Sequence, residues 1–256
     1  MFPLRDHNPS GSTPYVVYLL MAANILCYLW YSTSFDTARG LAGFYGTFAA
    51  VPREIMQGEA PLTLVSSIFI HGGLLHLAGN MLFLWIFGDN MEDEMGHLPF
   101  LIFYLACGIG ATLAHVLSAP QSNVPLVGAS GAIAGVMGGY LLMFPKARVD
   151  ILIILIFFFR IIPLPAFIML GLWLAMQFIG GLAADPNLGG VAYWAHAGGF
   201  FLGLALTVPL WLKRGGPRFW SRTAGQPPHP EVRYSASHIP RVPRQPQRRR
   251  PGPWGK

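Results

Sequence analysis

Six apolar segments, each long enough to cross a lipid bilayer, constrain this chain more than any other feature of its sequence. A spanning helix needs about 20 mainly apolar residues, which predicts spans at 14–31, 73–88, 98–118, 126–144, 164–182 and 192–212. Charged residues make up only 11% of the 256 residues, whereas they make up about 25% of a typical soluble domain. The sequence therefore predicts an all-α, multi-pass integral membrane protein with six transmembrane helices.

The positive charge of the chain gathers after the last span. Residues 213–256 hold 11 Lys or Arg and one acid, and they are rich in Pro, which predicts a disordered, basic C-terminal tail. Together with Lys146 and Arg148, this charge places both termini in the cytoplasm and makes 1–13 a short cytoplasmic segment. We expect the lipid bilayer of the plasma (inner) membrane to surround residues 14–212, and we do not expect nucleic acid to be a partner.

Two stretches between the spans are predicted to lie outside the bilayer core. The apolar run Ile151–Phe159 has nine residues, too few to cross, so it is expected at the interface or against the helix bundle. Residues 89–94 include four acids and are predicted to form a cytoplasmic loop.

Three of the predicted spans begin with polar residues, which are costly inside a membrane and therefore mark candidate functional sites. The second span contains His76 and Asn80, four positions apart and hence on one helix face. The fourth begins near Ser130, and the sixth near His196. All three spans begin on the outer side in the predicted topology, so these side chains are expected at a similar depth.

These residue types point to acyl transfer. A serine hydroxyl becomes a strong nucleophile when a neighbouring imidazole removes its proton, which predicts a catalytic dyad of Ser130 and His196. The side chains of His76 and Asn80, with backbone groups at Gly128 and Ser130, would stabilise the oxyanion. The sequence places no acid to orient His196, since Asp185 lies in the preceding predicted loop.

Small residues give the dyad a way to form. Gly131 and Gly135, and likewise Gly199 and Gly203, are separated by three residues, a spacing that lets helix backbones approach closely. We expect these glycines to bring the fourth and sixth spans together. Gln177, in the fifth span, is expected to hydrogen-bond another helix.

Other chemistries lack their residues. The sequence contains no His-Glu-x-x-His motif and no paired carboxylates within a span, so neither a zinc protease nor an aspartyl protease is predicted. Cys27 and Cys107 are expected to be packing residues, and neither a metal nor a cofactor is predicted. A purely structural role for the polar residues and a small transporter are weaker alternatives, the latter because the charges lie mostly in loops and tail.

Taken together, the motifs resemble the signature of the rhomboid intramembrane serine proteases. The matching motifs are His76-x-x-x-Asn80, Gly128-x-Ser130-Gly131, and Ala195-His196-x-x-Gly199 followed by Gly203. The resemblance extends from about residue 14 to 212 and implies a six-helix bundle. It also implies a serine endopeptidase that cleaves single-span or polytopic membrane proteins near the outer face, with Ser130 as nucleophile and His196 as base and without a metal.

The chain departs from the family pattern in two places. Its loop between the first and second predicted spans lacks the Trp-Arg pair that some members carry. Many members also have an aromatic residue four positions after the nucleophile, packed on the catalytic histidine, where this chain has Ala134. The alternative function is a catalytically silent rhomboid-like protein that binds membrane proteins, although such a protein would need neither Ser130 nor His196.

Overall fold

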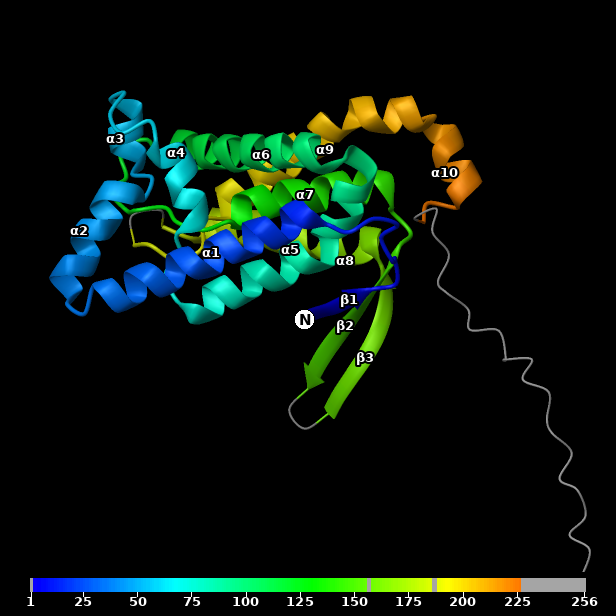
Figure 1. Cartoon of the computed structure of the whole chain (residues 1–256), viewed down its shortest axis with the longest axis horizontal. Coiled ribbons are helices and arrows are strands. Elements are labelled where there is room, and N and C mark those ends of the chain that lie inside the picture. The colour runs from blue at the N-terminus through cyan, green and yellow to red at the C-terminus, as the bar shows by residue number, and fades with distance from the viewer. Residues whose placement is uncertain (1, 156–157, 186–187, 227–256) are drawn as a thin grey trace, which may run out of the picture.

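The computed structural model describes residues 2–155, 158–185 and 188–226, and most of these residues are helical. In chain order the elements are β1 (Phe2–Asp6), α1 (Tyr15–Ser34), α2 (Ala38–Phe48), α3 (Pro52–Met56), α4 (Thr63–Ser66), the 3-10 helix η1 (Ser67–Phe69), α5 (Leu74–Met95), α6 (His97–Ser118), α7 (Ser130–Met143), β2 (Arg148–Leu155), β3 (Phe158–Pro165), α8 (Ala166–Ala183), α9 (Tyr193–Arg214) and α10 (Pro217–Thr223). The long helices form one bundle, with α2 and α3 at one end and the strands toward the other (Figure 1).

Four helices, α1, α6, α8 and α9, are long and apolar enough to cross a membrane. A fifth span is formed if α4 with η1 is joined to α5, although the two segments meet at 94°. The described part of the chain therefore has four or five helices that meet the criteria for a membrane span, which agrees with a multi-pass membrane protein.

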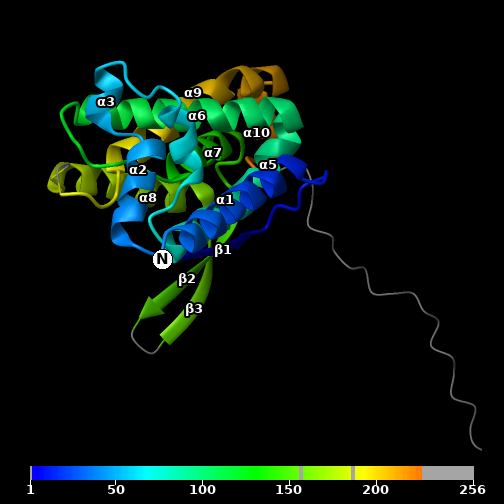
Figure 2. The same cartoon turned by 60° about the vertical axis from the view of Figure 1, so that its left-hand side comes forward.

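Helix α7 is the centre of the bundle. It has 14 residues, nearly all of them buried, and the views in Figures 1 and 2 agree that the longer helices surround it. At 1.5 Å per residue it is about 21 Å long, shorter than the roughly 30 Å hydrocarbon core. Its neighbours shield it from lipid, so it need not extend through the full thickness of a bilayer. The sequence predicted this span at 126–144, but the helix begins only at Ser130.

The predicted acidic loop at 89–94 is wrong, because α5 continues as a helix to Met95. The reason is a set of contacts with the start of α1. The Glu92 carboxylate is 1% exposed and accepts hydrogen bonds from the backbone N–H groups of Val16 and Val17, at 2.9 and 2.8 Å. A carboxylate at a helix N-terminus satisfies unpaired N–H groups and interacts favourably with the helix dipole. These contacts keep the last turns of α5 against α1.

The prediction of an all-α chain is also wrong, because β1, β2 and β3 form an antiparallel sheet in that order. Residues 148–165 are rich in β-branched and aromatic side chains, which favour strands, and Pro163 and Pro165 disfavour a helix. Val149 and Ile151 are fully buried in the main hydrophobic core. The described residues of the short apolar run therefore belong to two paired strands, β2 and β3, and Phe2–Asp6 of the predicted N-terminal segment forms a third.

Asp6, at the end of β1, joins the sheet to the bundle. Its carboxylate accepts a hydrogen bond from the Tyr140 hydroxyl of α7 at 3.0 Å and one from Asn8 Nδ2 at 3.2 Å. Burial, followed by the proximity of Asp89, raises the pKa of Asp6 from 3.8 to about 7. Folding therefore favours the protonated carboxyl, so Asp6 makes the folded state less stable as the pH rises from about 4 to 7.

We expect Asp6→Asn to remove this pH dependence. The wild-type chain should unfold at a lower temperature at pH 8 than at pH 5, by several degrees more than the variant. Thermal unfolding in detergent micelles at both pH values measures the difference. Asp36→Asn, which alters an exposed carboxyl between α1 and α2, is the matched control. The same pH response in Asp6→Asn and wild type would contradict the role of Asp6.

The prediction of a disordered tail from residue 213 is wrong for residues 213–226, which are folded. Helix α9 continues to Arg214, and α10 follows it after two glycines with positive φ. Trp220 of α10 donates a hydrogen bond to the carbonyl oxygen of Leu142 at 2.9 Å, and Phe219 is 3% exposed. These apolar side chains fold residues 213–226 onto the bundle. The rest of the predicted tail, 227–256, lies outside the described residues.

Candidate active site

Ser130 and His196 meet at the starts of two helices. Ser130 is the first residue of α7, and His196 lies in the first turn of α9. The distance from His196 Nε2 to Ser130 Oγ is 2.8 Å, within the hydrogen-bond range that a general base requires. The structure thus brings together the two residues that the sequence predicted as nucleophile and base, 66 positions apart in the chain.

The other nitrogen of the imidazole contacts a third side chain. His196 Nδ1 lies 2.8 Å from Oε1 of Gln177, on α8. Gln177 is 7% exposed, and its Nε2 donates to the carbonyl oxygen of Trp173 at 3.0 Å. The sequence predicted a hydrogen bond between Gln177 and another helix, but it did not predict that this bond would be made to His196.

An aromatic ring also packs on the imidazole. The centroid of the Trp173 indole lies 5.8 Å from that of His196, with 33° between the planes, and 6.1 Å from that of Phe200. Ala134 is fully buried, and its methyl side chain cannot make an aromatic contact. Trp173 therefore supplies an aromatic contact from α8 that residue 134 does not supply from α7.

The four predicted packing glycines lie where α7 and α9 touch. A Cβ atom added to Gly199 would lie 2.1 Å from the carbonyl oxygen of Gly131, and one added to Gly203 would lie 2.0 Å from that of Gly135. Real Cβ atoms do not come so close to a backbone oxygen. The contact between these helices therefore depends on glycine, and it sets the separation of Ser130 and His196.

His76, Asn80 and Gly128 surround the serine from another side. Gly128 has φ +126, and a Cβ atom there would lie 2.9 Å from His76 Nε2 and 3.6 Å from Ser130 Oγ, so the His76 ring lies directly against this glycine. Asn80 is 6% exposed, and its Nδ2 has no hydrogen-bond acceptor within the described ranges. His71, before α5, is fully buried with its ring edge-to-face on His76 at 5.1 Å.

Most of these groups line one cavity of about 520 Å³, which includes Ser130, His196, His76, Asn80 and Trp173 among its lining residues. That volume lies in the range of cavities that bind ligands. None of the described residues that line it is Asp, Glu, Lys or Arg. The cavity is therefore suited to a mainly apolar ligand that exposes a few polar groups.

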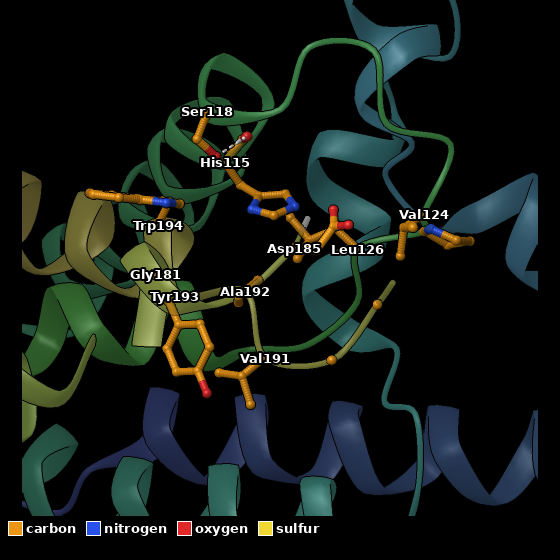
Figure 3. A pocket seen from close by; sticks show the side chains of 14 residues that line it. His115, Ser118, Val124, Leu126, Gly181, Asp185, Val191, Ala192, Tyr193 and Trp194 are labelled. Atoms are coloured by element: carbon orange, nitrogen blue, oxygen red, sulfur yellow. Dashed lines mark hydrogen bonds between the residues drawn. The ribbon is translucent and has the colours of Figure 1, made fainter. Parts of the chain in front are cut away.

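A smaller cavity of about 90 Å³ adjoins it and shares the segments around Leu126 and Val191. Figure 3 shows the side chains of His115, on α6, and Asp185, after α8, facing this space. Asp185 lies here, whereas the two ring nitrogens of His196 face Gln177 and Ser130. Neither Ser130 nor His196 lines the smaller cavity.

Within the described ranges, no group of three His, Cys, Asp or Glu side chains could hold a metal ion. The Ser130–His196 pair, the unpaired Asn80 Nδ2 and the adjoining cavity are suited to nucleophilic attack on a carbonyl. The contacts of Trp173 and Gln177 with His196 were not predicted from the sequence. A signal was available, because Gln177 is the one glutamine within the six predicted spans, and polar side chains in spans are functional candidates.

Comparison with known proteins gives a family match. The model of the Rhomboid domain matches residues 58–213. RHOMBOID-like protein 5 of Arabidopsis thaliana is 36% identical over 36% of this chain and 30% of its own length. Rhomboid protein 1, mitochondrial, of Saccharomyces cerevisiae is 32% identical over 56% of this chain and 40% of its own length. Rhomboid protease GluP of Bacillus subtilis is 33% identical over 60% of this chain and 28% of its own length. The matched region spans less than half of each of these relatives.

Proposed function

Because this chain belongs to the rhomboid family, we propose that it is an intramembrane serine endopeptidase that uses a dyad of Ser130 and His196. One observation carries the proposal. The imidazole Nε2 lies 2.8 Å from the serine hydroxyl at the wall of a cavity of about 520 Å³. An unreactive hydroxyl becomes a nucleophile in such an arrangement, and the cavity has room for a peptide segment beside it.

The reaction would proceed in two halves. Ser130 Oγ attacks the carbonyl carbon of the scissile peptide bond while His196 Nε2 accepts the hydroxyl proton. The tetrahedral intermediate then collapses, His196 returns that proton to the leaving amine, and the acyl group stays on Ser130. Water, activated by the same imidazole, hydrolyses the ester and restores the hydroxyl.

The oxyanion of each tetrahedral intermediate needs hydrogen-bond donors. Asn80 Nδ2 is a buried donor that has no acceptor in the part of the chain that is described, which suits a group that pairs only when negative charge develops. His76 lies against Gly128, beside Ser130. The Gly72 N–H faces His76 Nδ1 at 3.4 Å, an arrangement that favours a hydrogen on Nε2. These two donors, with the backbone N–H at Ser130, would form the oxyanion site.

The substrate we propose is a membrane protein, either single-span or polytopic. The larger cavity has no charged residue among the described ones that line it, so it suits an apolar segment whose backbone is exposed at one place. We propose six crossings, by α1, α5, α6, α7, α8 and α9, within residues 14–212 of a plasma-membrane protein. Both termini would lie in the cytoplasm, which places the starts of α5, α7 and α9, and hence the cleavage, on the outer side.

Reaction with a fluorophosphonate probe tests the function directly. Ser130 Oγ should displace fluoride from the probe, so the purified full chain in detergent should gain the mass of the probe less hydrogen fluoride, and peptide mapping should locate the adduct at Ser130. Labelling should be lost in His196→Ala, because the hydroxyl is then not activated. Absence of labelling in well-folded wild-type protein would refute the proposal and favour a catalytically silent rhomboid-like protein that binds membrane proteins.

A further inference from the structure

Gln177 holds His196 from the side opposite Ser130. Both ring nitrogens are engaged, Nδ1 at 2.8 Å from Gln177 Oε1 and Nε2 at 2.8 Å from Ser130 Oγ. The three residues come from α8, α9 and α7. A neutral imidazole has one donor and one acceptor nitrogen, so the partner of Nδ1 decides which nitrogen is available to the serine.

A backbone carbonyl fixes the direction of this chain of hydrogen bonds. Gln177 Nε2 lies 3.0 Å from the carbonyl oxygen of Trp173, which can only accept a hydrogen bond. The amide NH₂ therefore faces Trp173, and the amide oxygen faces His196. Because that oxygen can also only accept, the hydrogen of the neutral imidazole must be on Nδ1. The lone pair of Nε2 is then directed at the Ser130 hydroxyl.

We propose that Gln177 is a positioning residue that holds His196 in the tautomer able to deprotonate Ser130, and that Trp173 fixes both of them. The inference deepens the proposed function and rests on it. It extends the predicted dyad by a neutral third member, Gln177. A buried carboxylate would be costly within a membrane, whereas an amide orients the ring without adding a charge.

Trp173 contacts both Gln177 and His196. Its carbonyl oxygen orients the Gln177 amide one helical turn further along α8, and its indole packs on the His196 ring at 5.8 Å. Packing against an aromatic face restricts rotation of the imidazole. Since residue 134 is alanine, α8 supplies to His196 both an aromatic contact and a hydrogen-bond acceptor.

The tautomer can be measured without any substrate. In uniformly ¹⁵N-histidine-labelled full chain reconstituted in lipid vesicles, the nitrogen shifts of His196, assigned by comparison with His196→Ala, should show hydrogen on Nδ1 at neutral pH. In Gln177→Leu, residue 177 offers no oxygen to accept a hydrogen bond from His196 Nδ1. Both neutral tautomers of His196 should then be populated. Hydrogen on Nε2 in the wild-type protein would overturn the proposal, even if the variant failed to fold.

Kinetics separate positioning from a merely structural role. Gln177→Leu should lower the rate of fluorophosphonate labelling and the kcat for a transmembrane substrate by about 10- to 100-fold, with little change in KM. Gln177→Glu should recover much of the rate, with the acidic limb of its pH profile moved to higher pH, because a carboxylate favours the charged imidazolium. His76 and His115 are the other titratable groups that interact electrostatically with His196. The Gln177→Leu and Gln177→Glu variants leave both of them unchanged.

Met176→Ala, at a half-exposed neighbouring position of α8, is the matched control and should label at the wild-type rate. Labelling of Gln177→Leu at the wild-type rate would refute positioning, and so would equal loss in Gln177→Leu and Gln177→Glu at every pH. These results differ from failure of the proposed function, in which the wild-type protein itself would not label. The tautomer measurement still decides the role of Gln177 in that case.

Discussion

Ser130→Ala should abolish cleavage of a transmembrane substrate in reconstituted vesicles, with a fall in rate of about 10⁴-fold or more. The variant keeps the cavity, the base and the oxyanion donors, but it has no atom to form the acyl bond. The measurement is the cleavage rate of an apolar transmembrane peptide carrying a fluorophore and quencher on either side of the scissile bond. A loss of this size is typical when a member of the nucleophile–base unit is removed.

Ser118→Ala provides the matched control for this experiment. It makes the same chemical change at an exposed serine at the end of α6, which lines the smaller cavity and not the one that contains Ser130. We expect its cleavage rate to match that of the wild type. If Ser130→Ala retained cleavage while both variants were folded, the nucleophile would have to be a different residue.

Gly203→Ala should cost both stability and activity, although residue 203 contacts no substrate in the proposed mechanism. Its Cβ would lie 2.0 Å from the Gly135 carbonyl oxygen and 2.4 Å from the Gly135 Cα, and a backbone cannot move aside as a side chain can. Overpacking typically costs about 1–3 kcal/mol, which corresponds to roughly 3–10 °C in unfolding temperature. A shift of about 1 Å between α7 and α9 would lower kcat about 100-fold.

Thermal unfolding in micelles and single-turnover cleavage measure these two effects. Gly171→Ala is the matched control, because Gly171 also lies within a long apolar helix, but a methyl group there would meet no atom of a neighbouring described segment within 4 Å. Alanine there should raise the unfolding temperature slightly, since it favours helix more than glycine does. Equal behaviour of the two variants would show that the close contact of α7 and α9 does not position His196.

The family resemblance read from the motifs is confirmed by the match to the Rhomboid domain. Ser130, His196, His76 and Asn80 could be selected from the sequence as candidate site residues because each is polar in an apolar segment, where such residues are costly. Their convergence could be anticipated from the depth at which each span begins. The contact between Gln177 and His196 could not be anticipated from the sequence. It depends on how α8 packs beside α9, and no spacing within one helix determines that packing.

The sheet was missed for a different reason. Hydropathy alone does not distinguish a buried strand from part of a buried helix. The partner strand β1 is also far away in the sequence, since Phe2 pairs with Leu152. The continuation of α5 was missed because acids after an apolar segment are typical of a loop. Glu92 is instead bonded to the N-terminus of α1, a contact between segments about 76 residues apart.

The pairing of β1 with β2 has a consequence for the order of assembly. Phe2 is opposite Leu152, and Asp6 is opposite Val149, so a ribosome must add roughly 150 residues before the first strand can find its partner. Pairs so distant in sequence pay a loop-closure entropy before any contact rewards it, and they therefore form more slowly than local pairs. Because β2 follows α7 in the chain, the N-terminal strand can join the sheet only after the whole of α7 has been synthesised.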